Sequence, residues 1–210
     1  MNDIAPRLPI SHPQAFTQAE QLIQSGGVIA FPTDTVYGIG ASAFQTEAIE
    51  RIYHIKDRSH LKAIPILLAD PEDLEKVTPP LSPTAERLVK RFWPGALTLV
   101  LPMLPALPGI LSPTPTIGVR IPDHARARAL LRAVGPLAAT SANLTGDPPA
   151  LTAEQVERSI GSRVQLILDG GSAPGGISST VVDCSGEEPL LLREGPLSWE
   201  EIKGFLSSAG

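Results

Sequence analysis

The stretch FPTDTVYGIG (residues 31–40) joins an apolar run to a cluster of hydroxyls and glycines. Val28 to Phe31 predict a buried strand, because a short apolar run bounded by turn residues is typical of a strand in a sheet core. Thr33 and Thr35 flank an aspartate directly after this strand. Ligands bind at strand ends in α/β sheets, so we expect both hydroxyls to line a pocket and the glycines of the GIG segment to let backbone approach a ligand.

Helical and strand patterns alternate on both sides of this stretch. Apolar residues recur at helical spacing from Ala15 to Ile23, and the pair Gly26-Gly27 predicts the end of that helix. Thr46, Asp123, Thr152 and Ser198 are expected to cap further helices, and Asp70-Pro71 and Ser82-Pro83 are expected to start two more. Further strands are expected over residues 64–68, 97–101, 117–121, 137–140, 164–168, 180–183 and 190–192. This order predicts a single α/β domain over residues 1–210 with three layers, in which helices cover both faces of a twisted mixed β-sheet.

The composition indicates an acidic protein with a substantial hydrophobic core. Hydrophobic residues make up 42% of the 210 residues and the formal net charge is −5, so strong non-specific binding to nucleic acid or to an anionic membrane is not favoured. Cys184 is the only cysteine, which excludes an intrachain disulfide and fits a reducing compartment. The N-terminus lacks a secretory-signal pattern, and prolines interrupt the most apolar segment, residues 97–111. We therefore expect a cytoplasmic protein without a membrane span.

Polar clusters stand next to several of the expected strands. PTDT (residues 32–35) and TSAN (residues 140–143) follow strands, and GGISST (residues 175–180) precedes one. Each cluster alone could supply ordinary caps and turns, because Ser, Thr, Asn and Asp are the usual residues there. Together they favour a ligand site at one edge of the sheet.

Basic residues form the second component of this expected site. The segment KDRSHLK supplies Lys56, Arg58 and Lys62, while Arg120 lies inside the apolar segment TIGVRIP and Arg193 lies at a strand end. The first three could simply complement a helix dipole on a solvated face. Lys56 and Arg58 lie at or beyond a helix end, where we expect no structural role for them. Arg120 needs an anionic partner, a ligand or an exposed sheet face. Hydroxyls with convergent cations suit a phosphorylated ligand and a carboxylate.

Common catalytic signatures are absent or weak in the sequence. GGSAPGGISS has the glycine spacing of a P-loop without the Lys-Ser/Thr that should follow, and no Gly-x-Ser-x-Gly segment occurs. GIGASA matches a dinucleotide-binding pattern only weakly. The histidines are too scattered to indicate a metal site. These features predict a site that acts by positioning and charge neutralisation.

Motifs spread from about Pro13 to Leu206 resemble those of the YrdC-like threonylcarbamoyl-AMP synthase family in its short, single-domain form: PTDTVYGIG, KDRSHLK, FWPGALTLVL, TIGVRIPDH, TSANLTGDPP, STVVD and LLREG. The resemblance implies a twisted α/β fold with a concave central site. It also implies a nucleotidyltransferase that makes L-threonylcarbamoyladenylate and pyrophosphate from ATP, L-threonine and bicarbonate, for threonylcarbamoyladenosine modification of tRNA.

The resemblance further assigns roles to residues. It makes Lys56 and Arg58 catalytic. It places Arg58, Thr116, Ser141, Asn143 and Arg193 on ATP, and it places around threonine Thr35, Lys62, Arg120, Thr140 and Ser179. One departure is Ala63, where the family often has proline after the lysine. Mg²⁺ is expected to accompany ATP. We expect no metal ligands from the protein, and the sequence does not indicate a general base.

Two other functions remain open on the sequence alone. A concave basic surface would also suit an RNA- or ribosome-binding module of the same fold, although the acidic charge and an aromatic content of 4% argue against it. A dinucleotide-dependent enzyme built on GIGASA is the weaker alternative. For the synthase we expect weak or no direct tRNA binding, with separate tRNA threonylcarbamoyl-transferase machinery completing the modification.

Overall fold

The computed structural model describes residues 4–208, in which ten strands form one sheet. Their spatial order is β1 (Arg7–Pro9), β8 (Leu166–Asp169), β2 (Ile29–Phe31), β3 (Gly38–Ser42), β7 (Leu137–Ser141), β4 (Ile66–Leu67), β6 (Thr116–Arg120), β5 (Leu97–Pro102), β9 (Thr180–Asp183) and β10 (Leu190–Arg193). Parallel pairs such as β1 with β8 and antiparallel pairs such as β3 with β7 both occur. The predicted mixed α/β sheet is confirmed.

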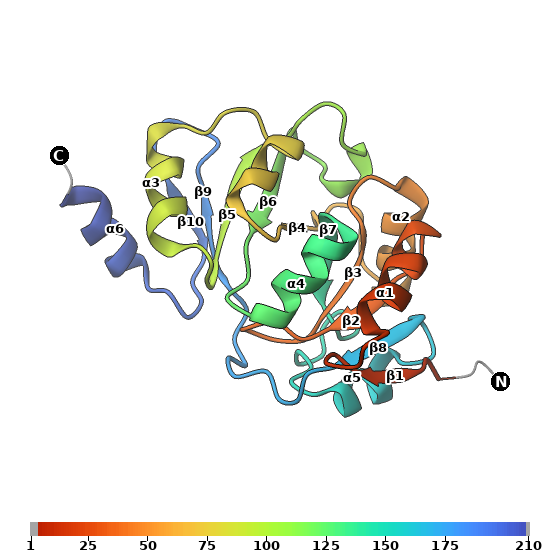
Figure 1. The fold of residues 1–210 in the computed structure, drawn as a ribbon. Coiled ribbons are helices and arrows are strands. Elements are labelled where there is room, and N and C mark those ends of the chain that lie inside the picture. Colours follow the sequence, from red (N-terminus) through yellow and green to blue (C-terminus); the bar gives the residue numbers. More distant parts are fainter. Residues whose placement is uncertain (1–3, 209–210) are drawn as a thin grey trace.

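Helices pack on both faces of the sheet, as Figure 1 shows. They are α1 (Ala15–Gln24), α2 (Thr46–Lys56), α3 (Pro83–Phe92), α4 (Ala125–Val134), α5 (Ala153–Ile160) and α6 (Trp199–Ser207), with 3₁₀ turns η1 (Pro71–Lys76) and η2 (Gly109–Leu111). The α1 and α4 side chains enter one hydrophobic cluster, whereas α2, α3, α5 and α6 contribute to a larger one. This arrangement confirms the expected three layers.

The smaller cluster covers only part of its sheet face. Its strand residues come from β2, β4, β7 and β8, and within residues 4–208 it takes none from β5, β6, β9 or β10. Thr98 on β5 pairs in register with Val181 on β9, and Val100 on β5 pairs with Gly118 on β6, all on the face turned away from the larger cluster. The part of this face formed by β5, β6, β9 and β10 is therefore left without a helical layer in the described part of the chain.

Most helix starts follow the expected capping chemistry. The side chains of Ser82, Thr152 and Ser198 each accept a hydrogen bond from the backbone N–H three residues later. Two starts were wrong by one residue. Thr46 is the first residue of α2, not its cap. α4 is capped by His124, whose Nδ1 accepts from the Ala127 N–H at 3.1 Å, instead of by Asp123.

The sequence did not predict β1 or β3. β3 contains the GIG segment, which we expected to be a loop that lets backbone approach a ligand, and it pairs with β2 and β7 on its two sides. A Cβ on Gly40 would lie 3.0 Å from Phe31 Cε1 and 3.3 Å from Leu137 Cδ1. Gly40 therefore makes room for the Phe31 ring, and the role of the two glycines toward a ligand stays a prediction.

The longest helix that the structure describes, α2, has eleven residues. None of the helices in residues 4–208 meets the length and hydropathy that a bilayer crossing requires.

Candidate active site

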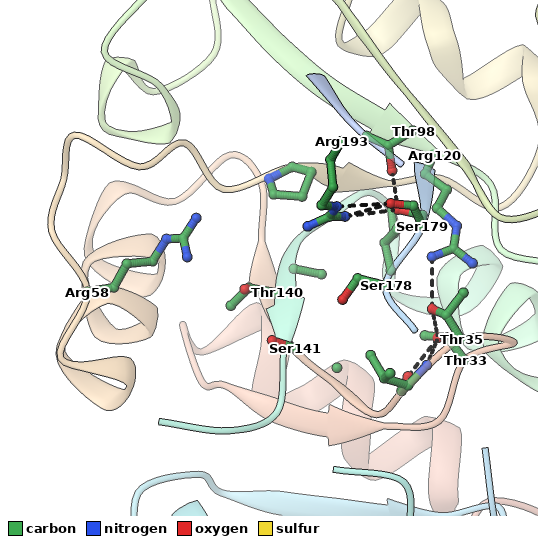
Figure 2. A pocket seen from close by; sticks show the side chains of 15 residues that line it. Thr33, Thr35, Arg58, Thr98, Arg120, Thr140, Ser141, Ser178, Ser179 and Arg193 are labelled. Atoms are coloured by element: carbon green, nitrogen blue, oxygen red, sulfur yellow. Dashed lines mark hydrogen bonds between the residues drawn. The ribbon is translucent and has the colours of Figure 1, made fainter. Parts of the chain in front are cut away.

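A pocket of about 200 Å³ lies where the helix-covered part of the sheet face meets the open part, and Figure 2 shows it from close by. Leu67 and Ala139 line it from the covered side, and Thr98 and Arg193 line it from the open side. Its polar lining comes mainly from strand ends and the loops beside them: Thr33, Thr35, Arg58, Arg120, Thr140, Ser141, Ser178 and Ser179. The three polar clusters of the sequence thus converge on one cavity.

The loop between β2 and β3 is held by a short network of hydroxyls. Thr33 Oγ1 donates to the Val36 carbonyl at 2.7 Å and accepts from the backbone N–H groups of Thr35 at 3.2 Å and Val36 at 3.3 Å. The hydroxyl oxygens of Thr33 and Thr35 lie 3.1 Å apart. Both side chains are buried, so this turn is a preformed part of the pocket wall.

Arg120 fixes the same loop from β6. Its guanidinium donates to the Gly95 carbonyl at 2.8 Å, to Thr35 Oγ1 at 3.0 Å and to the Asp34 carboxylate. Burial lowers the pKa of Arg120, and the nearby Asp34 carboxylate opposes that shift. The sequence predicted that Arg120 needs an anionic partner, a ligand or an exposed sheet face. In the structure the anionic partner is Asp34.

Arg193 is positioned by the segment that precedes β9. Its Nε and Nη2 atoms donate to the Ser179 carbonyl at 3.1 and 2.8 Å. The Ser179 hydroxyl lies 2.8 Å from Thr98 Oγ1 on β5, and both side chains are buried. Thr98 therefore ties the Ser179 segment, and with it Arg193, to the sheet.

The Arg58 side chain lines the pocket and also holds the loop that follows α2. Nε donates to the Lys62 carbonyl at 3.2 Å and Nη2 donates to the Ala63 carbonyl at 2.9 Å. Burial lowers the pKa of Arg58 and of Arg193, and the charge of Arg58 lowers the pKa of Arg193 further. Among the ion pairs of residues 4–208, none joins either guanidinium to a carboxylate. Two cations that repel each other thus line one cavity.

Lys56 is buried at the end of α2 and does not line the pocket. Its ammonium donates to the carbonyls of Ser141 and Asn143, both at 2.5 Å, and so holds the loop that follows β7. Burial lowers the pKa of Lys56 to about 8, and Arg58 adds to the shift. The expectation that Lys56 has no structural role is therefore wrong: the α2 end turns at Asp57, which has a φ of 47°, and the lysine points inward.

The structure brings together most of the side chains that the sequence singled out. The pocket lining includes Thr35, Arg58, Arg120, Thr140, Ser141, Ser179 and Arg193. It does not include Lys56, Lys62, Thr116 or Asn143. Asn143 is occupied in its own loop, where Nδ2 donates to the Leu144 carbonyl at 2.8 Å and the Asp147 carbonyl at 2.7 Å. The roles of all these residues toward a ligand stay predictions.

The sequence did not indicate three residues that line the pocket or support its wall: Thr98, Ser178 and Asp34. Thr98 is the single hydroxyl in the apolar run LTLVL, which was a usable signal because a polar residue inside a buried strand needs a partner. Asp34 stood between two threonines that we did single out. Its pairing with Arg120 joins residues 86 positions apart, which local sequence cannot reveal.

The described residues offer no ready metal site or reactive thiol. No group of three or more His, Cys, Asp or Glu side chains that could hold a metal ion occurs in residues 4–208. Cys184 is buried, and burial raises the pKa of its thiol to about 12. The thiol is therefore protonated at neutral pH and unsuited to nucleophilic chemistry.

Comparisons with known proteins agree with this geometry. A Bacillus subtilis protein named threonylcarbamoyl-AMP synthase is 42% identical over 207 residues, which cover 97% of this chain and 60% of that protein. The crystal structure of Pyrococcus abyssi Sua5 complexed with L-threonine superposes with a TM-score of 0.90 at 38% identity, covering 97% of this chain and 60% of that one. E. coli YciO superposes with a TM-score of 0.82 at 30% identity, covering 95% and 97% of the two chains.

This chain therefore spans about 60% of the first two relatives and nearly all of YciO. A family model for the Sua5, YciO and YrdC domain, described as "Telomere recombination", matches residues 21–195. That range includes every side chain of the pocket lining. The chain belongs to the Sua5, YciO and YrdC family.

Proposed function

We propose that this chain is an L-threonylcarbamoyladenylate synthase, a nucleotidyltransferase that converts ATP, L-threonine and bicarbonate into threonylcarbamoyl-AMP and pyrophosphate. The observation that carries the proposal is the pair of guanidinium groups, Arg58 and Arg193, which line one hydroxyl-rich pocket with backbone carbonyls as their hydrogen-bond partners. Two such cations repel each other, so a polyanion such as a triphosphate is the ligand that best offsets their charge.

The opposite wall of the pocket supports a small amino-acid site. Thr35 and Arg120 combine a hydroxyl with a guanidinium there, and both are buried. Such a pair suits the polar ends of a free amino acid. The L-threonine complex of the P. abyssi relative supports threonine as that amino acid.

The chemistry proceeds in two balanced steps. The neutral amine of threonine forms an N–C bond with bicarbonate, which releases water and gives a carbamate with a single negative charge. A carbamate oxygen then attacks the α-phosphorus of ATP as the bond to pyrophosphate breaks. Arg58 and Arg193 offset the charge that develops on the phosphate oxygens, which in a preorganised site is commonly worth ~3 kcal/mol for each contact.

The pocket contributes positioning instead of proton transfer. Its lining, within residues 4–208, contains no Asp, Glu or His side chain. Preorganised binding that holds the reactants in line can supply a large part of a rate enhancement without such a group. With no carboxylate cluster in the described residues, Mg²⁺ enters as part of the ATP substrate, bound to its phosphates.

The biological role proposed for this reaction is threonylcarbamoyladenosine modification of tRNA. The chain supplies the adenylate, and separate tRNA threonylcarbamoyl-transferase machinery consumes it. We also propose that residues 1–210 form one domain that carries the synthase reaction by itself.

The test is pyrophosphate release by the purified chain with ATP and bicarbonate, in parallel reactions with L-threonine, with L-valine and without an amino acid. We expect release that depends on threonine and bicarbonate and is much slower with valine, because polar groups that would meet the threonine hydroxyl are left unpaired. Equal release in all three reactions, or none in any of them, would refute the proposal.

A further inference from the structure

Arg58, one of the two guanidinium groups of the pocket, is anchored within its own loop, residues 57–63. Its Nε and Nη2 atoms donate to the carbonyls of Lys62 and Ala63 at 3.2 and 2.9 Å. A guanidinium has five N–H groups, so these two bonds leave three for a ligand. The direction of those three N–H groups therefore depends on how firmly the loop is attached to the rest of the fold.

Tyr53 reaches this loop from the last turn of α2. Its side chain is buried, and its ring belongs to the larger hydrophobic cluster. The hydroxyl oxygen lies 3.2 Å from the Lys62 carbonyl oxygen and 3.0 Å from the Ile110 carbonyl oxygen. A carbonyl can only accept, so the single phenolic proton is shared between the two oxygens in a three-centre hydrogen bond. Tyr53 thus clamps the loop to η2, which contains Ile110.

The Lys62 carbonyl is the point at which the two side chains meet. It accepts from Arg58 Nε and from the Tyr53 hydroxyl, each at 3.2 Å. A carbonyl oxygen has two lone pairs, so both bonds can form at once. Burial raises the pKa of Tyr53, and the charge of Arg58 opposes that shift, so the two groups also interact electrostatically. An anchor of the guanidinium is therefore itself fixed by Tyr53.

The Tyr53 ring makes a second contact with the same loop. Its centroid lies 4.3 Å from that of the His60 imidazole, with 36° between the ring planes. His60 Nε2 also lies 3.0 Å from Oε2 of Glu50, which stands three residues before Tyr53 on α2. One aromatic side chain thus holds the loop at two points, at His60 through its ring and at Lys62 through its hydroxyl.

We propose that Tyr53 is a positioning residue for Arg58, which keeps the guanidinium directed toward a phosphate of ATP. The proposal rests on the proposed function, in which ATP is the ligand of Arg58. Tyr53 is not among the residues that line the pocket within residues 4–208, so it acts through Arg58 and not by contact with the ligand. A guanidinium that is already in place loses less side-chain entropy when the ligand binds, which favours binding.

The experiment measures the dissociation constant of ATP for the wild-type chain, Tyr53→Phe, Arg58→Ala and the double variant. Phenylalanine keeps the ring and removes only the hydroxyl. We expect Tyr53→Phe to weaken ATP binding about three- to tenfold when Arg58 is present, the usual cost of one hydrogen bond. When Arg58 is already alanine, the same substitution should weaken it by less than about twofold. The affinity for L-threonine should not change in Tyr53→Phe.

Unchanged ATP affinity in Tyr53→Phe would overturn the inference. Equal weakening with and without Arg58 would overturn it too, because a general disturbance of the fold does not act through Arg58. A wild-type chain that binds no ATP would instead contradict the proposed function, and hydrogen exchange would then decide the role of Tyr53. The Lys62 amide, which donates to the Ser59 carbonyl at 3.0 Å, should exchange about threefold faster or more in Tyr53→Phe, and unchanged exchange would refute that role.

Should Tyr53→Phe fail to fold, the ring contact provides a second variant. His60→Ala removes the imidazole from the Tyr53 ring. His54→Ala is the matched control, because His54 also contacts Glu50, at 3.2 Å, but is exposed on α2 outside the loop. We expect ATP affinity to fall about threefold in His60→Ala, as for the loss of an aromatic pair, and to stay at the wild-type value in His54→Ala. Equal affinities of the two variants would contradict the inference.

Discussion

The Lys56 ammonium is a buried cation whose close partners are carbonyl oxygens and not a carboxylate. It is 2% exposed and bonded to the Ser141 and Asn143 carbonyls. Its folded-state pKa of about 8 lies below the ordinary 10.5. Between these two pH values the unfolded chain binds more protons than the folded chain, so the contribution of Lys56 to the free energy of unfolding increases as the pH rises through this window.

Lys56→Met tests this linkage, because methionine keeps much of the side-chain volume and removes the ionisable group. The free energy of unfolding of the wild type should rise relative to that of Lys56→Met by up to about 3 kcal/mol between about pH 7.5 and about pH 10.5, since one pKa unit corresponds to about 1.4 kcal/mol. Urea titrations of both proteins at several pH values measure the difference. Parallel pH profiles for the two proteins would show that Lys56 is not desolvated.

Arg58→Ala should lower turnover by ~10²-fold or more, since it removes one preorganised cation from a developing phosphate charge. Arg158→Ala is the matched control, because Arg158 is an exposed arginine on α5 outside the pocket lining. Initial rates of pyrophosphate release under saturating substrates provide the measurement. A rate for Arg58→Ala within a few-fold of the control would remove Arg58 from the catalytic assignment.

At the scale of elements, the segment before β9 depends on a close crossing of two backbones. A Cβ on Gly195, which follows β10, would lie 2.4 Å from the Ser178 carbonyl oxygen and 2.6 Å from the Thr180 nitrogen. The Gly195 N–H also donates to Thr180 Oγ1 at 2.9 Å. The chain on both sides of Ser179 is thus pressed against Gly195, and backbone atoms cannot give way as a flexible side chain does.

Gly195→Ala should therefore destabilise the fold by about 1–3 kcal/mol and reduce activity through displacement of Ser178 and Ser179. Gly204→Ala is the matched control: Gly204 is exposed on α6 with nothing within 4 Å of an added Cβ, and the substitution should stabilise that helix by about 0.5–1 kcal/mol. Urea unfolding midpoints compare the two. If both variants unfold at the wild-type midpoint, the close crossing does not constrain the fold.

Elements with strong local signals were predictable from the sequence. α3 combines a Ser82 cap, Pro83 at its first position and a regular apolar stripe, and it begins where expected. β3 carried no such signal, because its glycines suit a loop unless the Phe31 ring on the neighbouring strand is known. The convergence of strand ends on one pocket was likewise predictable, whereas the inward turn of Lys56 depends on the left-handed backbone of Asp57.

At the scale of the whole molecule, the distribution of charge matters more than its sum. The formal net charge is −5, yet Arg58 and Arg193, which pair with no carboxylate among residues 4–208, face one cavity. A protein that holds many tRNA phosphates needs a broad basic surface, and its affinity falls steeply with salt. The charge distribution here instead suits one compact polyanion, which is why we expect the product to leave as a diffusible adenylate.

Incubation of the purified chain with ATP, L-threonine, [¹³C]bicarbonate and unmodified tRNA provides the most direct test of the proposed synthase reaction. Mass spectrometry of the small-molecule and tRNA fractions then locates the labelled carbon. We predict that it appears in an adenylate joined to threonine and that the tRNA fraction stays unlabelled. Labelled tRNA would contradict the proposed need for separate transfer machinery, and the absence of any labelled adenylate would contradict the synthase function itself.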